Sequence, residues 1–322
     1  TFVRAITVRD PSPELVSAQA LSLPGLLLVK DEIPLAPTPT FARPVLGRVG
    51  DATAELVAAS GGRIQAGDQT GLSGLQASYD ETLAGRPGQV LQLVPTIGAA
   101  RDLHTVPPKP GTPVRTTLDV RLQTAADATL AAVKPASALV AIRPSDGQVL
   151  AVASGPGGEG VSTATLGQYA PGSTFKAVSA LALLRAGLTP SSSVDCPATL
   201  VVDGRTFKNY TGYPTSKLGA IPLRTAFAQS CNTAFMGQRG KLSDAALAEA
   251  AAGLGLGGDP ALGVPATFGA VPTNNGDIDK AASMIGQGRV QASPLGMATV
   301  AASIAAGHPV TPVLVREPAP TA

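Results

Sequence analysis

The sequence predicts an α+β fold in which a part with short strands is followed by a part rich in helices. Residues 137–155 contain two β-branched runs around an Asp146-Gly147 turn, a pattern that indicates a hairpin. From residue 173 onward, apolar runs of helical length recur between loops that contain Gly and Pro, and strands followed by helices are typical of the α+β class. The chain has 322 residues, 44% hydrophobic and 14% charged, which fits a globular protein with room for two domains.

Charge and composition exclude several classes of function. The net charge of +2 gives no strong field toward nucleic acid, and 3% aromatic residues with no Trp offer few platforms for stacking bases or sugars. No run of 18 apolar residues and no signal-peptide pattern occurs. The opening residues, TFVRAITVRD, resemble a strand entered midway, so we expect the natural N-terminus, with any targeting segment, to lie upstream.

The N-terminal part is predicted to hold small elements separated by Gly and Pro. Residues 47–62, GRVGDATAELVAASGG, predict a strand, a helix capped by Asp51 and a Gly stop. Residues 66–88 are punctuated by Gly around one amphipathic helix, with Leu75, Tyr79 and Leu83 at a spacing of four. Four prolines in residues 104–114 indicate a joint between domains, or an edge strand interrupted by prolines. We therefore place a first domain at 1–110 and a second at 111–322.

The second part begins with a helix and the hairpin. Residues 119–134 predict an amphipathic helix whose apolar face carries Leu122, Ala125, Ala126, Leu130 and Val133. Further helices are predicted near 221–238 and 243–252. The last predicted helix starts at Ser293, a capping residue that is followed by Pro294 in the first turn.

Residues 171–187, PGSTFKAVSALALLRAG, place Ser173 and Lys176 three residues apart at the start of an apolar helix. Ser173 or Thr174 can cap this helix, Gly187 can end it, and residues 177–184 predict burial on nearly every face. In the simplest interpretation Ser173 is a cap and Lys176 reaches water. In the chemical one, burial and the helix dipole lower the pKa of Lys176, so that its neutral amine takes the Ser173 proton.

A second polar group lies in AFAQSCNTAF, residues 226–235, which offers Ser230 and Asn232. Alone, these two residues would be interpreted as a polar helix start. Together with Ser173-Thr174-Phe175-Lys176, they resemble the active-site motifs of penicillin-binding proteins and serine β-lactamases. YAPGSTFK, SCNTAFMG, ALVAIRPSDGQVLAVASGP and IGQGRVQASPLGMA are all similar to stretches of a penicillin-binding transpeptidase domain. ARPVLGRVG and GDQTGLSGLQASYDETLAGRPG resemble the non-catalytic pedestal domain of class B members, with an actinobacterial composition.

The resemblance implies a β-lactamase-like transpeptidase domain, an antiparallel sheet flanked by helices, behind an N-terminal pedestal. It implies a peptidoglycan D,D-transpeptidase in which Ser173 attacks a D-Ala-D-Ala stem peptide and Lys176 accepts the proton. Ser230 would relay a proton to the leaving amine, and Asn232 would hold the substrate amide. No cofactor or metal is expected. His104 and His308 fall outside the motifs, so no Ser-His-Asp triad is expected.

The family's third motif, Lys followed by Thr-Gly or Ser-Gly on a cleft-edge strand, does not occur in the sequence. Only 90 residues follow Asn232, so we expect the chain to stop before the last strands of the domain. The partners implied are peptidoglycan stem peptides, β-lactams and a membrane glycosyltransferase, but no nucleic acid. The location implied is the outer face of the cytoplasmic membrane, with the anchor outside this chain.

Two alternatives remain open. A class D-type β-lactamase or β-lactam sensor also carries Ser-Thr-Phe-Lys, but that pattern has an apolar residue in place of Asn232 and lacks a long pedestal. A slowly lost antibiotic adduct would separate a transpeptidase from such an enzyme. A non-catalytic cell-wall scaffold would keep the fold without acylation of Ser173.

The two cysteines, Cys196 and Cys231, permit one disulfide. If Ser230 and Asn232 both face the cleft, Cys231 between them faces the helical packing behind it, where Cys196 can also lie. An exported protein matures where disulfides persist, so we expect the bridge. Two separate buried thiols are the alternative.

Overall fold

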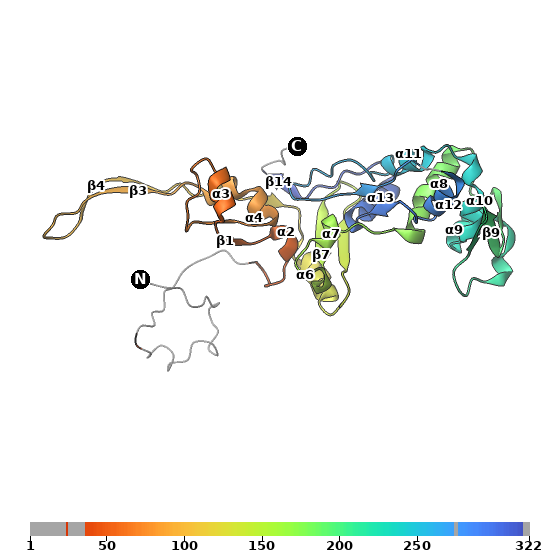
Figure 1. Ribbon diagram of the computed structural model, residues 1–322, viewed down its shortest axis with the longest axis horizontal. Coiled ribbons are helices and arrows are strands. Elements are labelled where there is room, and N and C mark those ends of the chain that lie inside the picture. Colours follow the sequence, from red (N-terminus) through yellow and green to blue (C-terminus); the bar gives the residue numbers. More distant parts are fainter. Residues whose placement is uncertain (1–23, 25–35, 274–275, 318–322) are drawn as a thin grey trace. The chain divides into compact units, whose positions relative to one another are not determined.

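The structure is a computed structural model that describes residues 24, 36–273 and 276–317 (Figure 1). The description below concerns the unit Pro37–Ala322. The strand expected in the first ten residues lies outside the described residues. Among the residues described, none of the helices combines the length and the apolar content needed to cross a membrane.

The part before residue 85 holds the small elements α2 (Arg43–Leu46), β1 (Val49–Asp51), α3 (Ala54–Ala59), β2 (Gln69–Gly71), α4 (Gly74–Ser78) and α5 (Asp80–Ala84). β1 and β2 pair antiparallel. The expected cap of α3 was wrong: Asp51 ends β1, and the Thr53 hydroxyl accepts the hydrogen bond from Leu56 N instead. The single helix expected over Leu75–Leu83 is two short ones, because the chain turns at Tyr79.

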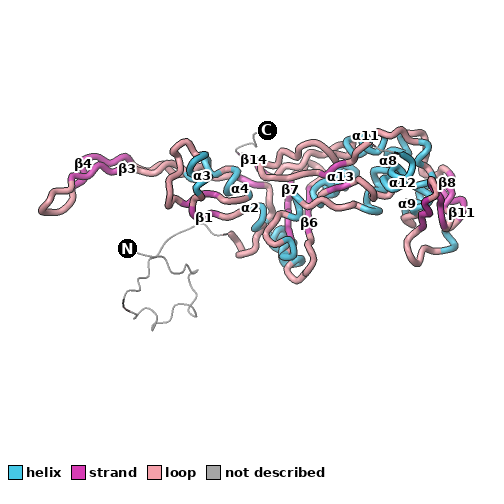
Figure 2. Tube along the Cα trace, in the orientation of Figure 1, coloured by secondary structure: helices cyan, strands magenta, loops and turns pink. Residues whose placement is uncertain are grey.

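The predicted joint begins inside a strand. β3 (Gln89–Leu93) and β4 (Arg101–Val106) form an antiparallel hairpin, drawn in magenta in Figure 2, and every residue of both strands is exposed. His104 therefore lies in β4, where it pairs with Leu91, and not in a proline-rich loop. Arg86 and Lys109 then form an antiparallel bridge, so pairing continues between the prolines, as in the edge-strand interpretation. β5 (Arg115–Thr116) follows.

The hairpin of the second part formed as predicted. β6 (Ala138–Ile142) and β7 (Val149–Ser154) pair antiparallel, with α6 (Val120–Leu130) packed on β7 and α13 (Pro294–Ala306) on β6. The predicted apolar face of α6 is partly wrong, because Leu122 is exposed and Gln123 is buried. The Gln123 Oε1 accepts a hydrogen bond from Val152 N at 2.8 Å, so a satisfied polar side chain replaces the apolar one.

The remaining elements build the helical region. They are η1 (Pro156–Gly158), α7 (Thr163–Leu166), η2 (Gly172–Phe175), α8 (Lys176–Arg185), β8 (Ser193–Cys196), β9 (Thr199–Val202), β10 (Arg205–Lys208), η3 (Thr215–Lys217), β11 (Gly219–Pro222), α9 (Leu223–Ala228), α10 (Asn232–Gly237), η4 (Arg239–Lys241), α11 (Ala246–Ala252), β12 (Gly269–Ala270), α12 (Gly276–Ser283), β13 (Gln291–Ala292) and β14 (Val315–Glu317). The helix expected over 221–238 is thus two helices, α9 and α10. The Ser293 cap of α13 is confirmed, since its Oγ accepts from Gly296 N.

The described strands pair into seven two-stranded antiparallel sheets. A parallel bridge between Gln148 and Val313 also brings the chain before β14 beside the β6–β7 hairpin. The largest core cluster gathers α8, α10 and α11, with Phe175, Leu183 and Phe235 fully buried. Figure 1 shows α8, α10 and α12 close together, so this core supports the two motifs that carry Ser173 and Ser230.

Candidate active site

Ser173 lies in η2, a tight turn that leads directly into α8. Neither Ser173 nor Thr174 caps the helix, contrary to expectation. The Thr174 hydroxyl donates to Pro171 O at 2.6 Å, and the Ser173 hydroxyl accepts from Lys176. Because the 3₁₀ turn supplies the entry to the helix, the Ser173 side chain is not engaged in capping and remains beside the lysine.

A close approach by Gly286 fixes this turn. The Gly172 N–H donates to Gly286 O at 2.9 Å. Gly286 has a φ of +66°, and a Cβ built on it would lie 2.4 Å from Gly172 O and 2.6 Å from the Phe175 Cβ. Only glycine satisfies both the left-handed backbone and this contact, so residue 286 defines where Ser173 lies.

Lys176 is the first residue of α8, and only 1% of its surface is exposed. Its Nζ donates to Ser173 Oγ at 3.0 Å and to both oxygens of Ser230, at 2.9 Å to Oγ and 3.0 Å to the carbonyl. It also donates to Asn232 Oδ1 at 2.7 Å. Burial lowers the pKa of Lys176 from its usual 10.5 to about 8, in the direction expected from the sequence.

Ser230 lies in the break between α9 and α10. Its φ of +56° is left-handed, which is uncommon for a residue that is neither Gly nor Asn. This conformation turns the chain so that both the carbonyl and the hydroxyl of Ser230 meet Lys176. Strain of this kind is concentrated at functional sites, where the surrounding structure holds it in place.

The expected disulfide is present. Cys196, the last residue of β8, is bonded to Cys231, with the two Cα atoms 6.3 Å apart. Both cysteines are fully buried in the main core, so Cys231 points away from the side chains of its neighbours, Ser230 and Asn232. The bridge ties the strained segment to a neighbouring strand.

Asn209 was missed by the sequence analysis. It follows β10, is 7% exposed, and its Oδ1 accepts hydrogen bonds from the backbone N–H groups of Asn232 and Thr233. In the sequence it precedes Tyr-Thr-Gly and has the composition of an ordinary turn. No local pattern indicates a contact that spans more than twenty residues.

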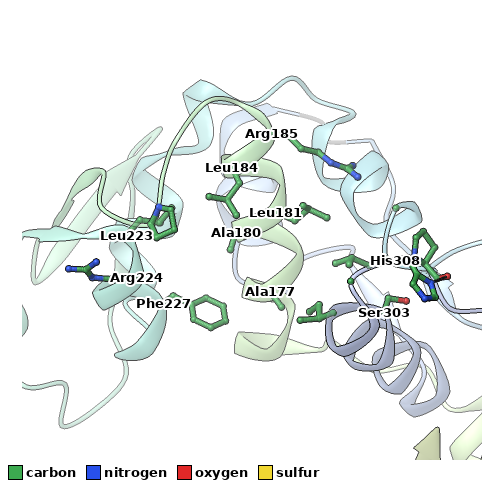
Figure 3. Close-up of a pocket in the computed structure, with 16 residues that line it drawn as sticks. Ala177, Ala180, Leu181, Leu184, Arg185, Leu223, Arg224, Phe227, Ser303 and His308 are labelled. Carbon is green, nitrogen blue, oxygen red and sulfur yellow. Dashed lines mark hydrogen bonds between the residues drawn. The ribbon is translucent and has the colours of Figure 1, made fainter. Parts of the chain in front are cut away.

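One face of α8 is not covered by the described residues, contrary to the expectation of burial all round. Ala180, Leu181 and Leu184 line an apolar cavity of about 680 Å³, and Phe227 reaches it from α9 (Figure 3). His308, which follows the end of α13 at Ala306, also lines this cavity. The structure brings neither His308 nor His104 to Ser173, so the cluster consists of Ser173, Lys176, Ser230 and Asn232.

A serine hydroxyl beside a buried lysine of lowered pKa, with a second serine on the same lysine, is the arrangement of Ser–Lys acyl-transfer enzymes. Comparison with protein-family models shows to which family of such enzymes the chain belongs. The penicillin binding protein transpeptidase domain matches residues 137–320, and the penicillin-binding protein dimerisation domain matches residues 7–116. The first match spans more than half of the chain, so the chain belongs to the penicillin-binding protein transpeptidase family. The two models together confirm the class B resemblance, while the boundary at 110/111 stays a prediction.

Curated relatives are actinobacterial. The chain is 35% identical over 145 residues to peptidoglycan D,D-transpeptidase PbpA of Mycobacterium tuberculosis, a match that covers 43% of this chain and 29% of that protein. For the PbpA of Mycolicibacterium smegmatis the identity is 37% over 142 residues, covering 42% and 28%. The matched region is thus less than a third of the length of these relatives.

Solved structures share the fold. PBP2 from Helicobacter pylori, in complex with MreC, has a TM-score of 0.74 at 22% identity and covers 87% of this chain and 58% of that chain, which supports the fold alone. Penicillin-binding protein A from M. tuberculosis, as a penicillin G acyl-enzyme complex, has a TM-score of 0.57 at 29% identity. The match covers 65% of this chain and 56% of that chain.

Proposed function

We propose that this chain carries the acylation centre of a peptidoglycan D,D-transpeptidase. Ser173 Oγ attacks the carbonyl carbon of the penultimate D-Ala of a stem peptide, and the bond to the terminal D-Ala breaks. The acyl group then passes from Ser173 to an amine of a neighbouring stem, which restores the hydroxyl. The observation that carries this proposal is the contact of Lys176 Nζ with both Ser173 Oγ and Ser230 Oγ.

Lys176 has the position and the pKa of a general base. With a pKa of about 8, roughly one tenth of the lysine is a neutral amine at pH 7. That amine can take the proton from Ser173 Oγ, 3.0 Å away, as the bond to the substrate carbonyl forms. The N-terminal end of the 3₁₀ turn and α8 favours the negative charge that develops beside it.

Ser230 is suited to return the proton. Its hydroxyl lies 2.9 Å from Lys176 Nζ, so a proton on the lysine can pass through Ser230 Oγ to the nitrogen of the departing D-Ala. In the second half of the reaction the same route runs in reverse, because the incoming amine must lose a proton.

Asn232 is suited to hold the substrate amide. Its Oδ1 accepts from Lys176, and its Nδ2 donates to Lys208 O at 3.3 Å. An amide NH₂ group carries two hydrogens, so one donor remains for a peptide carbonyl of the substrate. The amide thereby connects the base to the bound peptide.

β-Lactams are the expected inhibitors, because their strained amide resembles the D-Ala-D-Ala bond and their acyl group stays on Ser173. The penicillin G complex of the M. tuberculosis relative supports this extension to the present chain. We place the protein on the outer face of the cytoplasmic membrane, with a membrane glycosyltransferase as its partner. A solved relative described with polymerization and crosslinking by a peptidoglycan synthase complex, 28% identical with a TM-score of 0.74, supports a partner that carries out polymerization.

The test is intact-mass spectrometry of the full-length protein after incubation with penicillin G. We expect one covalent adduct of the antibiotic mass in the wild type and none in Ser173→Ala. The adduct should persist over many minutes, whereas rapid loss with release of hydrolysed antibiotic would favour a β-lactamase. Absence of any adduct on the folded wild type would favour the non-catalytic scaffold.

A further inference from the structure

We propose that Asn209 is a positioning residue of the acylation centre, acting through Asn232. The inference rests on the proposed function, since it concerns how the same site is held. Asn209 touches neither Ser173 nor Lys176 among the hydrogen bonds of the described residues. It determines where Asn232, the closest partner of Lys176, can lie.

The amide oxygen of Asn209 caps α10 from outside the helix. Its Oδ1 accepts from Asn232 N at 2.8 Å and from Thr233 N at 3.1 Å, the first two N–H groups of that helix. These groups have no partner within the helix and would otherwise be buried unsatisfied. The third N–H, that of Ala234, meets the Cys231 sulfur at 3.3 Å. Asn209 thus fixes the backbone of the residue whose side chain contacts the base.

The amide nitrogen of Asn209 is anchored in turn. Its Nδ2 donates to Pro197 O and to Thr233 Oγ1, both at 3.2 Å. Pro197 follows Cys196, which is bonded to Cys231. Both ends of the Asn209 amide are therefore occupied in a site that is 7% exposed, and the side chain cannot rotate without breaking at least two hydrogen bonds.

The residue before Asn209 orients the Asn232 side chain. Lys208 O accepts from Asn232 Nδ2 at 3.3 Å, which leaves Oδ1 directed at Lys176 Nζ, 2.7 Å away. Lys208 and Asn209 thus hold Asn232 in two ways. The Asn209 side chain binds the Asn232 backbone, and the Lys208 backbone carbonyl binds the Asn232 side chain. Because Oδ1 accepts from the ammonium form of Lys176, losing this alignment removes a stabiliser of that form.

The test measures penicillin G acylation rates of full-length variants between pH 6 and 10. In Asn209→Ala we expect the acylation rate to fall by about tenfold or more, on the scale of a lost helix cap. The midpoint of its pH profile should be lower than in the wild type. In Asn209→Asp the acceptor is kept, so most of the rate should return. The added carboxylate favours the Lys176 ammonium, so the midpoint should move up instead.

Gln123→Ala is the matched control, because Gln123 is also a buried amide that accepts from a backbone N–H, in this case on β7. Gln123→Ala should lower the melting temperature without moving the midpoint of the pH profile of acylation. If the role of Asn209 is purely structural, Asn209→Ala will give the same result as this control, a lower melting temperature with an unmoved pH midpoint of acylation, which would overturn the proposal.

The outcomes separate this inference from the function on which it rests. A wild type that shows no acylation removes the proposed function itself. A wild type that reacts, with Asn209→Ala equal to it in rate and midpoint, removes only the role of Asn209. If Asn209→Ala fails to fold, Asn209→Ser decides, because its short uncharged side chain cannot take the place of the Asn209 amide: a slower acylation with a lower pH midpoint supports positioning through Asn232, and a wild-type rate and midpoint contradict it.

Discussion

Lys176 Nζ donates to Asn232 Oδ1 across 2.7 Å, although 56 residues separate the two in the chain. This is the shortest of the hydrogen bonds that Lys176 makes, and all of its acceptors within the described residues are neutral oxygens. A carboxylate in the place of Asn232 would hold the ammonium charged. With an amide there, burial dominates, and the pKa of Lys176 falls into the range where a lysine serves as a base.

The first prediction concerns the pH dependence of acylation. The rate of Ser173 acylation by penicillin G should rise with pH and level off above a midpoint near 8, because the neutral Lys176 amine is the reactive form. Stopped-flow or quenched-flow measurements on the full-length protein give the profile. Lys176→Arg should lose orders of magnitude at every pH, since a guanidinium does not deprotonate in this range. A flat profile, or near-normal rates in Lys176→Arg, would assign the base elsewhere.

The second prediction links the same group to stability. The folded state lowers the pKa of Lys176 below its unfolded value of 10.5, so between about 8 and 10.5 the unfolded chain binds more protons. The contribution of Lys176 to the free energy of unfolding should therefore increase as the pH rises from 8 to 10. It should decrease again when the pH is lowered from 10 to 8. Burial raises the pKa of Tyr79 and Tyr213, which opposes the trend above pH 10.

Lys176→Met is the control for this experiment, because it keeps both tyrosines and a long buried side chain. The difference in unfolding free energy between wild type and Lys176→Met, measured by urea denaturation at each pH, isolates the lysine. It should shift in favour of the wild type from pH 8 to 10. A constant difference over this range would mean that Lys176 has the same pKa in both states.

The sequence predicted which side chains gather at the candidate site better than it predicted how the chain brings them together. Ser173 and Lys176 are three residues apart and Ser230 and Asn232 two, so local motifs revealed them. Asn209 could not be found in this way, because only the folded chain brings it to α10. The division of the helix expected over 221–238 was also hidden, since Ser230 is left-handed without being Gly or Asn.

The wrong predictions about the fold have similar physical causes. Asp51 and Thr53 are both good helix caps two residues apart, and propensity cannot choose between them. The apolar pattern of α8 correctly indicated a helix, but the identity of its residues does not tell which faces are covered by other parts of the chain. Ala180 and Leu184 consequently line a cavity that the sequence did not predict. The β6–β7 hairpin was predicted correctly, because its turn and its alternation are both local.

The third prediction concerns the Cys196–Cys231 bridge. It closes a loop of 35 residues, for which the chain-entropy relation gives roughly 3–4 kcal/mol of stabilisation. The double variant Cys196→Ser and Cys231→Ser should lose about that much in chemical denaturation of the full-length protein. A reducing agent should destabilise the wild type by a similar amount and leave the double variant unchanged. Equal stability of the wild type with and without reductant would show that the bridge does not contribute.

The last prediction separates the two roles of Ser230, its hydroxyl and its left-handed backbone. Ser230→Ala and Ser230→Gly both remove the hydroxyl that accepts from Lys176 Nζ. Only glycine also relieves the strain of a φ of +56°. Glycine also costs stability, because it is more flexible than alanine in the unfolded chain. The relief of strain should exceed this cost, so the Gly variant should be more stable than the Ala variant by about 1 kcal/mol.

Acylation by penicillin G should fall in both Ser230 variants by a similar factor, on the order of a hundredfold, because the proton relay is lost in each. Melting temperatures and acylation rates of the two proteins, measured side by side, therefore report different properties of one residue. Equal stability would mean that the backbone at position 230 carries no strain that glycine can relieve. A wild-type rate in either variant would mean that the proton reaches the leaving amine by a route that bypasses Ser230.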